Sequence, residues 1–343
     1  MSRIPDLVQD TRLDTTFDDR YTVHHHDDSD DERNARSMRR AEVWQWEHML
    51  ARGGCGEVWL QRCVQGGRSH NWRAVKVVPR ETQVHYISEL EAIAKFSQKR
   101  YSKCFVKLFG WYTAGTSLCI AMEYFPLGDL QKQMSSGGPI AHDDVRDICF
   151  QIMEGLHYMH REGFAHRDIK PGNVLVKSRP PASSWWVKLS DFGISKRLEE
   201  SMGQLSTVKG TVSYMAPELL GHEPGSPVQI DYMASDMWSA GEMTFRMLTK
   251  SATFSSHRAL LRYLDRPDLF PSQEITNHGG SEDAASFIRQ LMQPSPESRL
   301  RSGQALEHPW LRLYSQQCNQ SYTQPYGEPG STLTPPAIPM YDS

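Results

Sequence analysis

The side chains best suited to chemistry gather near the middle of this 343-residue chain. Asn173 stands five residues after Asp168, and a further acid, Asp191, comes after an apolar segment and a turn. A carboxylate such as Asp168 can accept the proton of an attacking hydroxyl, while the oxygens of Asn173 and Asp191 are hard ligands of the kind that Mg²⁺ prefers. This layout predicts phosphoryl transfer, with Asp168 as the catalytic carboxylate that accepts the proton and the other two as metal ligands.

A second set of candidates precedes this stretch. Lys76 interrupts the strand expected over residues 73–78, and a charged side chain in a β-branched run needs an anionic partner. Nucleotide phosphates and a carboxylate from the helix expected over 82–98 would provide one. Upstream, residues 51–58 are rich in glycine, which lets a backbone approach phosphates and direct its N–H groups at them. A hairpin with two glycines at its tip would have the same appearance.

These motifs resemble those of a known family. The run from His166 to Asn173, followed by Asp191–Gly193, resembles the catalytic and magnesium loops of the eukaryotic protein kinases, and Lys170 resembles the serine/threonine branch. Residues 51–58 resemble the kinase glycine-rich loop, although Ala51 stands where the family usually has its first glycine. The resemblance implies an α+β, bilobal kinase-like fold, with a small β-rich N-lobe carrying one key helix and a larger, mainly helical C-lobe.

The resemblance also implies roles for single residues and the cofactors ATP and Mg²⁺. Lys76 positions the phosphates and pairs with Glu89, which we favour over Glu91 because the order of residues 89–93 resembles the family helix. The catalytic set is then Asp168, Lys170, Lys76 and Glu89. The residues expected around the nucleotide are Leu50, Gly53, Gly56, Val58, Ala74, Lys76, Met122, Glu123, Phe125 and Leu175. Among these, Met122 would guard the back of the adenine pocket, and the backbone of Glu123 and Phe125 would contact the adenine edge.

Further residues are expected to support this site. By resemblance, Asp236 braces the catalytic-loop backbone, Glu218 pairs with a buried Arg299, and Thr211 holds the catalytic residues in place. The segment before Thr211 contains Thr207 and Ser206, whose phosphorylation would add charge that can pair with arginine and order the loop. A constitutively competent loop without phosphate is the alternative.

The domain boundaries follow from composition. Residues 1–42 are rich in acids and poor in core formers, which predicts a disordered acidic leader. The run 24–28 has three histidines and two aspartates that could bind a transition metal, but adjacent histidines in a flexible tail lack a fixed geometry, and we favour no functional metal there. The kinase domain is expected over 43–314, divided into an N-lobe (43–124) and a C-lobe (125–314), and a flexible Pro-rich tail over 315–343.

Overall composition sets broad limits on function. The formal net charge of -3 indicates neither nucleic-acid binding nor a cationic membrane surface. The six cysteines are scattered without the spacing of a zinc or disulfide framework, and the chain has neither a signal-peptide-like start nor a run of apolar residues long enough to span a membrane. We therefore expect an intracellular protein without a membrane span that acts on protein substrates, while the oligomeric state is not indicated.

Two alternatives to an active enzyme remain. A pseudokinase that binds partners without chemistry has the altered first glycine, Ala51, in its support. A binding scaffold would use the leader and the tail while the kinase fold serves as a platform.

A separate expectation concerns Cys55 in the glycine-rich loop, whose thiol is either reactive near bound phosphates or, as we favour, unreactive.

Overall fold

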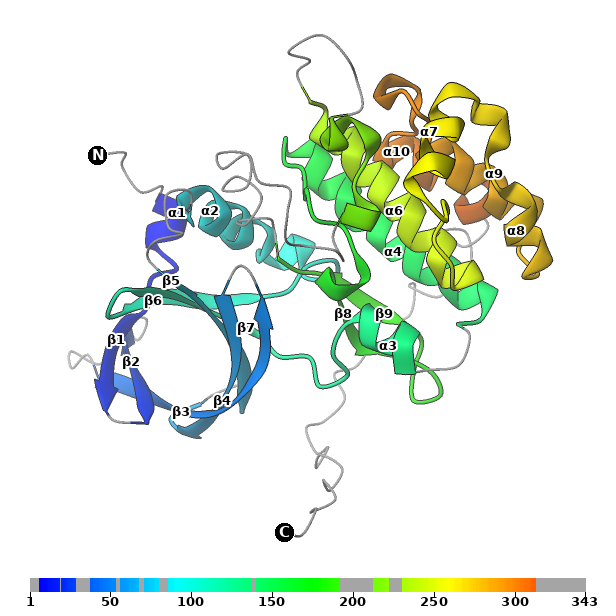
Figure 1. Ribbon diagram of the computed structural model, residues 1–343. Helices are drawn as coiled ribbons and strands as arrows, with labels where there is room; N and C mark the ends of the chain where they lie inside the picture. The colour runs from blue at the N-terminus through cyan, green and yellow to red at the C-terminus, as the bar shows by residue number, and fades with distance from the viewer. Residues whose placement is uncertain are drawn as a thin grey trace.

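The fold consists of a strand-rich N-lobe and a helical C-lobe (Figure 1). The computed structural model describes residues 6–18, 20–28, 38–53, 56–67, 71–79, 86–136, 140–191, 212–221 and 230–312. The presence of a strand-rich N-lobe and a helical C-lobe confirms the expected bilobal kinase-like architecture.

The N-lobe is built around one seven-stranded antiparallel sheet in the order β1-β2-β3-β4-β5-β7-β6. Its strands are β1 (Asp14–Asp18), β2 (Tyr21–Asp28), β3 (Met38–Gly53), β4 (Gly56–Gln65), β5 (Trp72–Pro79), β6 (Leu108–Ala114) and β7 (Ser117–Glu123). Figure 1 shows this sheet curled into a barrel-like ring. The two edges meet, because the Leu13 N–H donates to the Trp111 carbonyl at 2.8 Å and the Trp111 N–H donates to the Thr11 carbonyl at 3.0 Å.

The prediction of a disordered leader over residues 1–42 is wrong for the described part of that range. Residues 6–9 form the short helix α1 (Asp6–Gln9), and β1, β2 and the start of β3 extend the sheet. The β2 side chains that face the inside of the ring are polar, and Thr22 and His24 are buried there. Because these buried positions of β2 carry polar residues, the strand lacks the apolar alternation by which a sequence reveals a strand.

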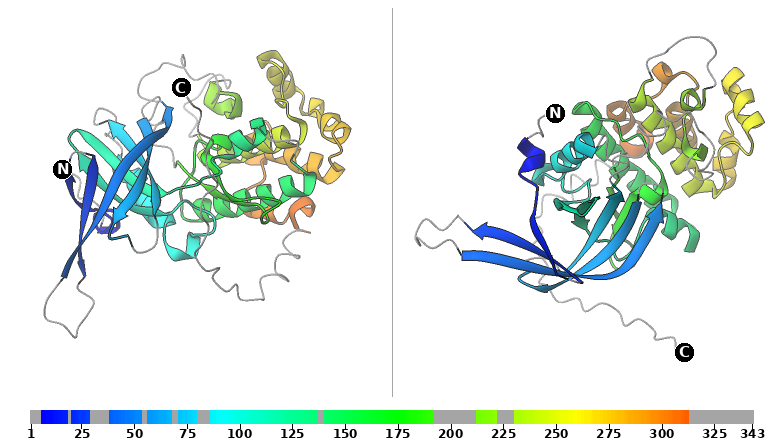
Figure 2. Two further views of the ribbon diagram at one scale, coloured as in Figure 1. Left: turned by 90° about the horizontal axis from the view of Figure 1, so that it is seen from below. Right: turned by 60° about the vertical axis from the view of Figure 1, so that its left-hand side comes forward.

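One longer helix covers this sheet in the N-lobe. Helix α2 (Tyr86–Phe96) lies within the span 82–98 expected from the sequence, of which residues 82–85 are outside the described residues. Its residues Leu90 and Ile93 are buried against β6 and β7, and Figure 2 shows the helix lying beside α1. This packing fixes the helix that carries Glu89 over the sheet that carries Lys76.

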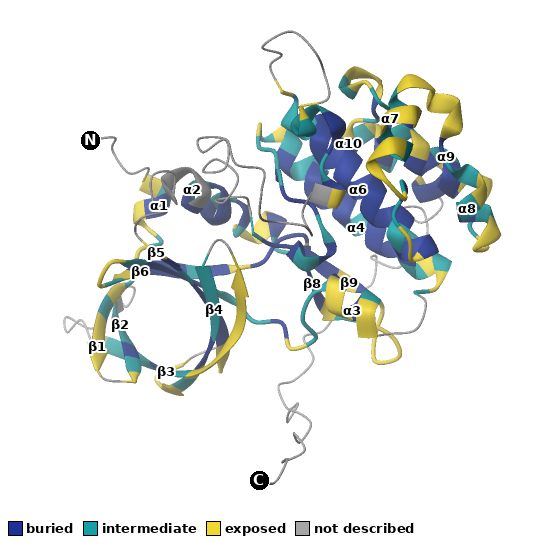
Figure 3. Ribbon diagram, viewed as in Figure 1, coloured by how far each residue is buried: buried dark blue, intermediate teal, exposed yellow. Residues whose placement is uncertain are grey.

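The C-lobe is organised around two long helices, α4 (His142–Arg161) and α6 (Tyr232–Thr249). Their buried faces form the centre of the main hydrophobic core, seen as the dark region of Figure 3. The other helices are α3 (Leu130–Ser136), α7 (His257–Asp265), α8 (Ser272–Asn277), α9 (Glu282–Leu291) and α10 (Ser302–Leu306). Helix α6 begins with an Asp231 cap, whose carboxylate accepts the Ala234 N–H at 3.0 Å.

A hairpin joins the catalytic loop to the acid expected to bind metal. It consists of β8 (Val174–Ser178) and β9 (Trp186–Leu189), and its turn contains two tryptophans whose role the sequence does not explain. Trp185 is buried in the main core, where its carbonyl accepts the Gln151 amide at 2.8 Å. Trp186 is 40% exposed and its indole N–H donates to the Lys103 carbonyl at 2.9 Å. Trp185 therefore anchors the hairpin to α4, and Trp186 anchors it to the segment before β6.

Two further observations concern the described residues as a group. The cysteines among them, Cys63, Cys104, Cys119 and Cys149, are all free thiols. No helix in the described ranges is long and apolar enough to cross a membrane.

Candidate active site

The catalytic loop leaves α4 and ends in a 3₁₀ turn, Pro171–Asn173, directly before β8. Asp168 is buried at 7% exposure, and its carboxylate accepts the Lys170 ammonium at 2.8 Å and the Asn173 amide at 3.0 Å. The same Asn173 amide also donates to the Asp168 carbonyl at 2.8 Å. These contacts fix the orientation of the carboxylate and bring together three residues that the sequence predicts to act together.

Asp236 of α6 holds the backbone of the catalytic loop through hydrogen bonds. Its carboxylate accepts the backbone N–H groups of His166 and Arg167, each at 2.7 Å, and lies 3.0 Å from Nε2 of His160. Arg167 has a positive φ of 67°, a conformation that costs energy for a residue with a side chain and persists only where its surroundings impose it. The expected bracing role of Asp236 is confirmed by these contacts.

The β8–β9 hairpin places Asn173 beside Asp191. Val174 pairs with Leu189, so the next residues outward face one another, and the Ser190 N–H donates to the Asn173 carbonyl at 2.9 Å. Asp191 follows at once, with a positive φ of 58° that turns the chain. The two expected metal ligands therefore come from the two ends of one hairpin.

Lys76 reaches Asp191 from the other lobe. It lies in β5 with only 7% exposure, and its Nζ is 2.6 Å from Oδ1 of Asp191. Glu89, the other expected partner of Lys76, is on α2, but its side chain is outside the described residues. The contact between Lys76 and Asp191 nevertheless joins the two lobes at the site.

His166 supports the same region from inside the core. The residue is fully buried, and its Nε2 lies 3.1 Å from the Ser190 carbonyl oxygen. Burial lowers the pKa of His166 below its usual value, although nearby Asp236, Asp168 and Asp191 act in the opposite direction. The imidazole is therefore neutral at physiological pH and acts as a structural link between the loop and the hairpin.

The expected nucleotide-binding residues come from neighbouring strands. Ala74 of β5 lies opposite Met122 of β7, and Val58 of β4 lies opposite Lys76. Residues 123–128 form the hinge, the segment that joins the two lobes. Leu175 of β8 bridges to Asp129 just after the hinge, which brings the C-lobe side of the pocket close to it. Leu50, at 38% exposure, lies in β3 near the glycine-rich loop.

Only one of the two expected loop glycines is required by packing. Gly56 has φ of 122°, and a Cβ there would lie 2.1 Å from the Val77 carbonyl oxygen, so no other residue fits. A Cβ at Gly53 would meet no atom within 4 Å. Ala51 pairs with Val58 in β3, directly after a register shift that follows Met49, and it does not have a positive φ. The backbone at residue 51 therefore accommodates a Cβ.

The hinge contains an ion-pair cluster that the sequence does not reveal. The Glu123 carboxylate accepts Lys177 of β8 at 2.6 Å and Lys188 of β9 at 2.8 Å. Burial would raise the pKa of Glu123, but the hydrogen bonds from these two lysines outweigh it and lower the pKa. Both lysines also lie near the ring of buried Phe125, at 5.6 and 6.0 Å. The side chains of the two expected adenine-contacting residues thus tie the hinge to the hairpin.

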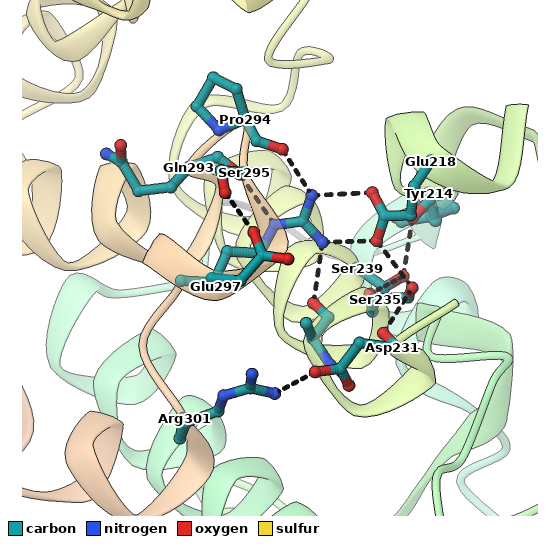
Figure 4. Close-up of polar contacts among 12 residues, drawn as sticks. Tyr214, Glu218, Asp231, Ser235, Ser239, Gln293, Pro294, Ser295, Glu297 and Arg301 are labelled. Carbon is teal, nitrogen blue, oxygen red and sulfur yellow. Dashed lines mark hydrogen bonds and ion pairs between the residues drawn. The ribbon is translucent and has the colours of Figure 1, made fainter. Parts of the chain in front are cut away.

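The expected pair of Glu218 and Arg299 is present in the C-lobe (Figure 4). Its two nitrogen-to-oxygen distances are 2.7 and 2.8 Å, and the Arg299 side chain is 0% exposed. Glu218 also accepts the Ser235 hydroxyl at 2.8 Å. The bidentate contact therefore ties the turn that contains Glu218 to the segment around Arg299, and the Ser235 contact ties it to α6.

The donor set fits ATP and Mg²⁺. Mg²⁺ is commonly held by one or two protein oxygen ligands and completed by substrate phosphates and water. Asn173 uses its amide nitrogen on Asp168, which leaves its oxygen for a metal, and Asp191 is a carboxylate at the mouth of the site. The described residues contain no group of three or more His, Cys, Asp or Glu that could hold a metal.

Histidines 24–26 are arranged differently from a metal site. They alternate along β2, with Nδ1 of His24 2.8 Å from the Thr15 hydroxyl and Nε2 of His25 3.0 Å from the Thr16 hydroxyl. Successive side chains of a strand point to opposite faces, so the three rings do not converge.

Several expectations lie outside the described residues. They are the reactivity of Cys55, the anchoring role of Thr211, the phosphorylation of Thr207 or Ser206, and the tail over 315–343.

Comparison with known proteins agrees with this site. A family model described as a protein kinase domain matches residues 44–311. The chain is 30% identical over 257 residues to the serine/threonine-protein kinase cds1 of Schizosaccharomyces pombe, covering 72% of this chain and 54% of that protein. It is 30% identical over 262 residues to the serine/threonine-protein kinase RAD53 of Saccharomyces cerevisiae, covering 73% and 31%. It is also 33% identical over 210 residues to serine/threonine-protein kinase 17A of Oryctolagus cuniculus, covering 60% and 50%.

The solved structures agree on the fold. A crystal structure of Rad53 residues 1–466 in complex with AMP-PNP superposes with a TM-score of 0.62 and 23% identity, covering 85% of this chain and 82% of that one. Of the curated relatives named above, the chain spans about a third to a half of the length. The family match and the identities together show that the chain belongs to the eukaryotic-type serine/threonine protein kinase family.

Proposed function

We propose that this chain is an active kinase that transfers the γ-phosphate of ATP to serine or threonine hydroxyls of protein substrates. The observation that carries the proposal is the contact between Lys76 and Asp191 at 2.6 Å beside a buried, oriented Asp168. Lys76 comes from the N-lobe and the other two residues from the C-lobe, so these three residues with expected catalytic roles lie where the two lobes meet. The AMP-PNP bound to the related Rad53 structure supports ATP as the nucleotide.

Three residues of the chain have separate roles in the proposed phosphoryl transfer. Asp168 is fixed by Lys170 and Asn173, so its carboxylate can accept or orient the proton of the acceptor hydroxyl. Lys170 places a positive charge beside that carboxylate, where negative charge develops during transfer. Lys76 donates to phosphate oxygens and is kept in position by Asp191.

The bound metal would supply charge neutralisation at the phosphates, with Asn173 and Asp191 as its protein ligands. The rest of catalysis is positioning, for which burial and hydrogen bonding prepare the site in advance. Ala51, the residue that favoured a pseudokinase, has no positive φ that would require glycine, so this argument against activity is weakened.

The test is the variant Asp168→Asn in the full chain. We expect turnover to fall by about 10²–10⁴-fold, because the metal ligands remain and the proton-accepting carboxylate is lost. ADP binding in the presence of Mg²⁺, measured by titration calorimetry, should stay near the wild-type value. Asp143→Asn, at an exposed acid on α4, is the matched control. Equal turnover in Asp168→Asn and wild type would contradict the assigned role.

A further inference from the structure

Leu7 and Val8 lie against helix α2, although both precede the segment that matches the kinase family. Val8 is 0% exposed, and it shares one hydrophobic cluster with Leu90 and Ile93 of α2 and Trp111 of β6. Leu7 packs against the same cluster. Figures 1 and 2 both show α1 beside α2. The N-terminal segment, defined as residues 6–13, therefore forms part of the surface on which α2 rests.

Directional contacts fix this segment at the edge of the sheet. The Trp111 indole N–H donates to the Val8 carbonyl at 2.8 Å, and the backbone of Trp111 exchanges hydrogen bonds with Thr11 and Leu13. The Arg12 guanidinium lies 5.4 Å from the centre of the Trp111 ring. Hydrophobic burial alone would allow sliding along the sheet, whereas these bonds define one position.

The sheet is shaped to receive the segment. Gly110 has φ of 144°, and a Cβ there would lie 2.6 Å from the Leu13 side chain and 2.8 Å from the Thr11 carbonyl oxygen. Only a residue without a side chain allows this approach. The close contact between β6 and the N-terminal segment therefore depends on the glycine at position 110.

The cluster under Val8 extends to the catalytic cleft. Met122, which is expected to guard the adenine pocket, packs against the same group of residues. Helix α2 carries Glu89, the expected partner of Lys76, and its buried face rests on this cluster. Loss of volume at Val8 would let α2 move relative to β5, because packed interiors respond to the removal of even single methyl groups.

We propose that the N-terminal segment is an intramolecular positioning element, in which Val8 holds α2 in the position relative to β5 that phosphoryl transfer requires. This inference rests on the proposed kinase activity. Val8 touches neither nucleotide nor acceptor, so it is a positioning residue that acts through α2. Errors of about 1 Å in the placement of catalytic groups can cost 10²-fold in rate, so a small shift of α2 is sufficient.

The experiment compares four full-length proteins, wild type, Val8→Ala, Val8→Ile and Gln9→Ala. Gln9 is exposed on the same short helix and is the matched control. For each protein, kcat is measured per folded molecule, with the folded fraction counted by ADP binding, and amide hydrogen exchange is measured in α2. We expect Val8→Ala to lower kcat about tenfold and to speed exchange in α2, while ADP affinity changes little. Gln9→Ala should match wild type, and Val8→Ile, which keeps an apolar side chain against α2, should lower kcat less than Val8→Ala.

The two readouts separate the possible failures. A purely structural role for Val8 would lower the melting temperature but leave kcat per folded molecule and α2 exchange unchanged, and that result overturns the inference. A wild-type protein without phosphoryl transfer would refute the proposed function, whereas α2 exchange would still decide whether Val8 holds the helix. Unchanged α2 exchange in Val8→Ala overturns the inference in either case.

Discussion

Two buried arginines, one in each lobe, differ in how fully their N–H groups are hydrogen-bonded. In the C-lobe, all five N–H hydrogens of Arg299 are satisfied, two by Glu218 and the others by the carbonyls of Ala234, Gln293 and Pro294. In the N-lobe, Arg73 is 1% exposed, and its Nε donates to the Gln61 side chain at 2.8 Å. Its Nη2 has no hydrogen-bond partner among the described residues.

The two sites differ in how the charge is balanced. The Glu218 carboxylate neutralises Arg299 directly, whereas no carboxylate of the described residues forms an ion pair with Arg73. Arg73 instead lies over the Trp44 ring at 4.0 Å. Burial lowers the pKa of Arg73 to about 10, so it is still charged at neutral pH. A buried charge can thus be held by a paired carboxylate or by diffuse polar and aromatic contacts, and the two arrangements should respond differently to mutation.

The largest effect should come from removing the paired carboxylate. Glu218→Ala leaves Arg299 buried without its counter-charge, which should lower the free energy of unfolding by about 3–5 kcal/mol. Urea denaturation of the full chain measures this. Glu297→Ala, at an exposed glutamate near the same turn, is the control and should have little effect. Equal losses in the two variants would show that the C-lobe arginine does not depend on its pair.

A smaller, pH-dependent effect is expected at His24, which lies inside the N-lobe ring beside Arg73. Burial and the nearby Arg73 lower the pKa of His24 to about 2. The unfolded chain then binds a proton below the usual pKa of about 6.5 that the folded chain does not, so stability must fall as the pH falls. Between pH 7.5 and 5.5 this one group should lower the free energy of unfolding by about 1.4 kcal/mol.

The variant His24→Asn isolates that contribution. Urea denaturation at the two pH values should show a loss about 1.4 kcal/mol smaller in the variant than in wild type. His25→Asn, on the opposite face of the same strand, controls for the substitution itself. An unchanged pH dependence in His24→Asn would mean that the ring interior admits a protonated imidazole.

The smallest effect is expected at Arg73 itself. Because no carboxylate is left uncompensated, Arg73→Met should change the free energy of unfolding by about 1 kcal/mol or less, through the lost hydrogen bond to Gln61. Arg299→Met, measured in the same denaturation series, should cost several-fold more. Similar costs for the two variants would remove the distinction between the sites.

Local motifs explain why much of the catalytic site could be predicted. Asp168, Lys170 and Asn173 lie within six residues of one another, so their spacing already contains the geometry that the loop later shows. Lys76 and Asp191 are distant in sequence, but each stands in a recognisable strand or turn motif.

Other features depend on contacts that no local pattern shows. Lys177 and Lys188 meet Glu123 across 54 and 65 residues and look like ordinary surface lysines in the sequence. The leader is predicted to be disordered because it is rich in acids and poor in core formers, yet its polar residues Thr22 and His24 are buried once the strands join the sheet. Tertiary pairing, and not composition, determines the structure of that segment.

The central claim is that this chain transfers phosphate to serine or threonine hydroxyls through Asp168. The most direct measurement incubates the full chain with γ-labelled ATP, Mg²⁺ and two matched peptide libraries, one with serine and threonine acceptors and one with tyrosine. Asp168→Asn serves as the comparison. We predict label on phosphoserine or phosphothreonine with the wild type, at a rate about 10²–10⁴-fold higher than with the variant. Wild-type labelling no higher than that of Asp168→Asn, or labelling confined to tyrosine, would contradict the claim.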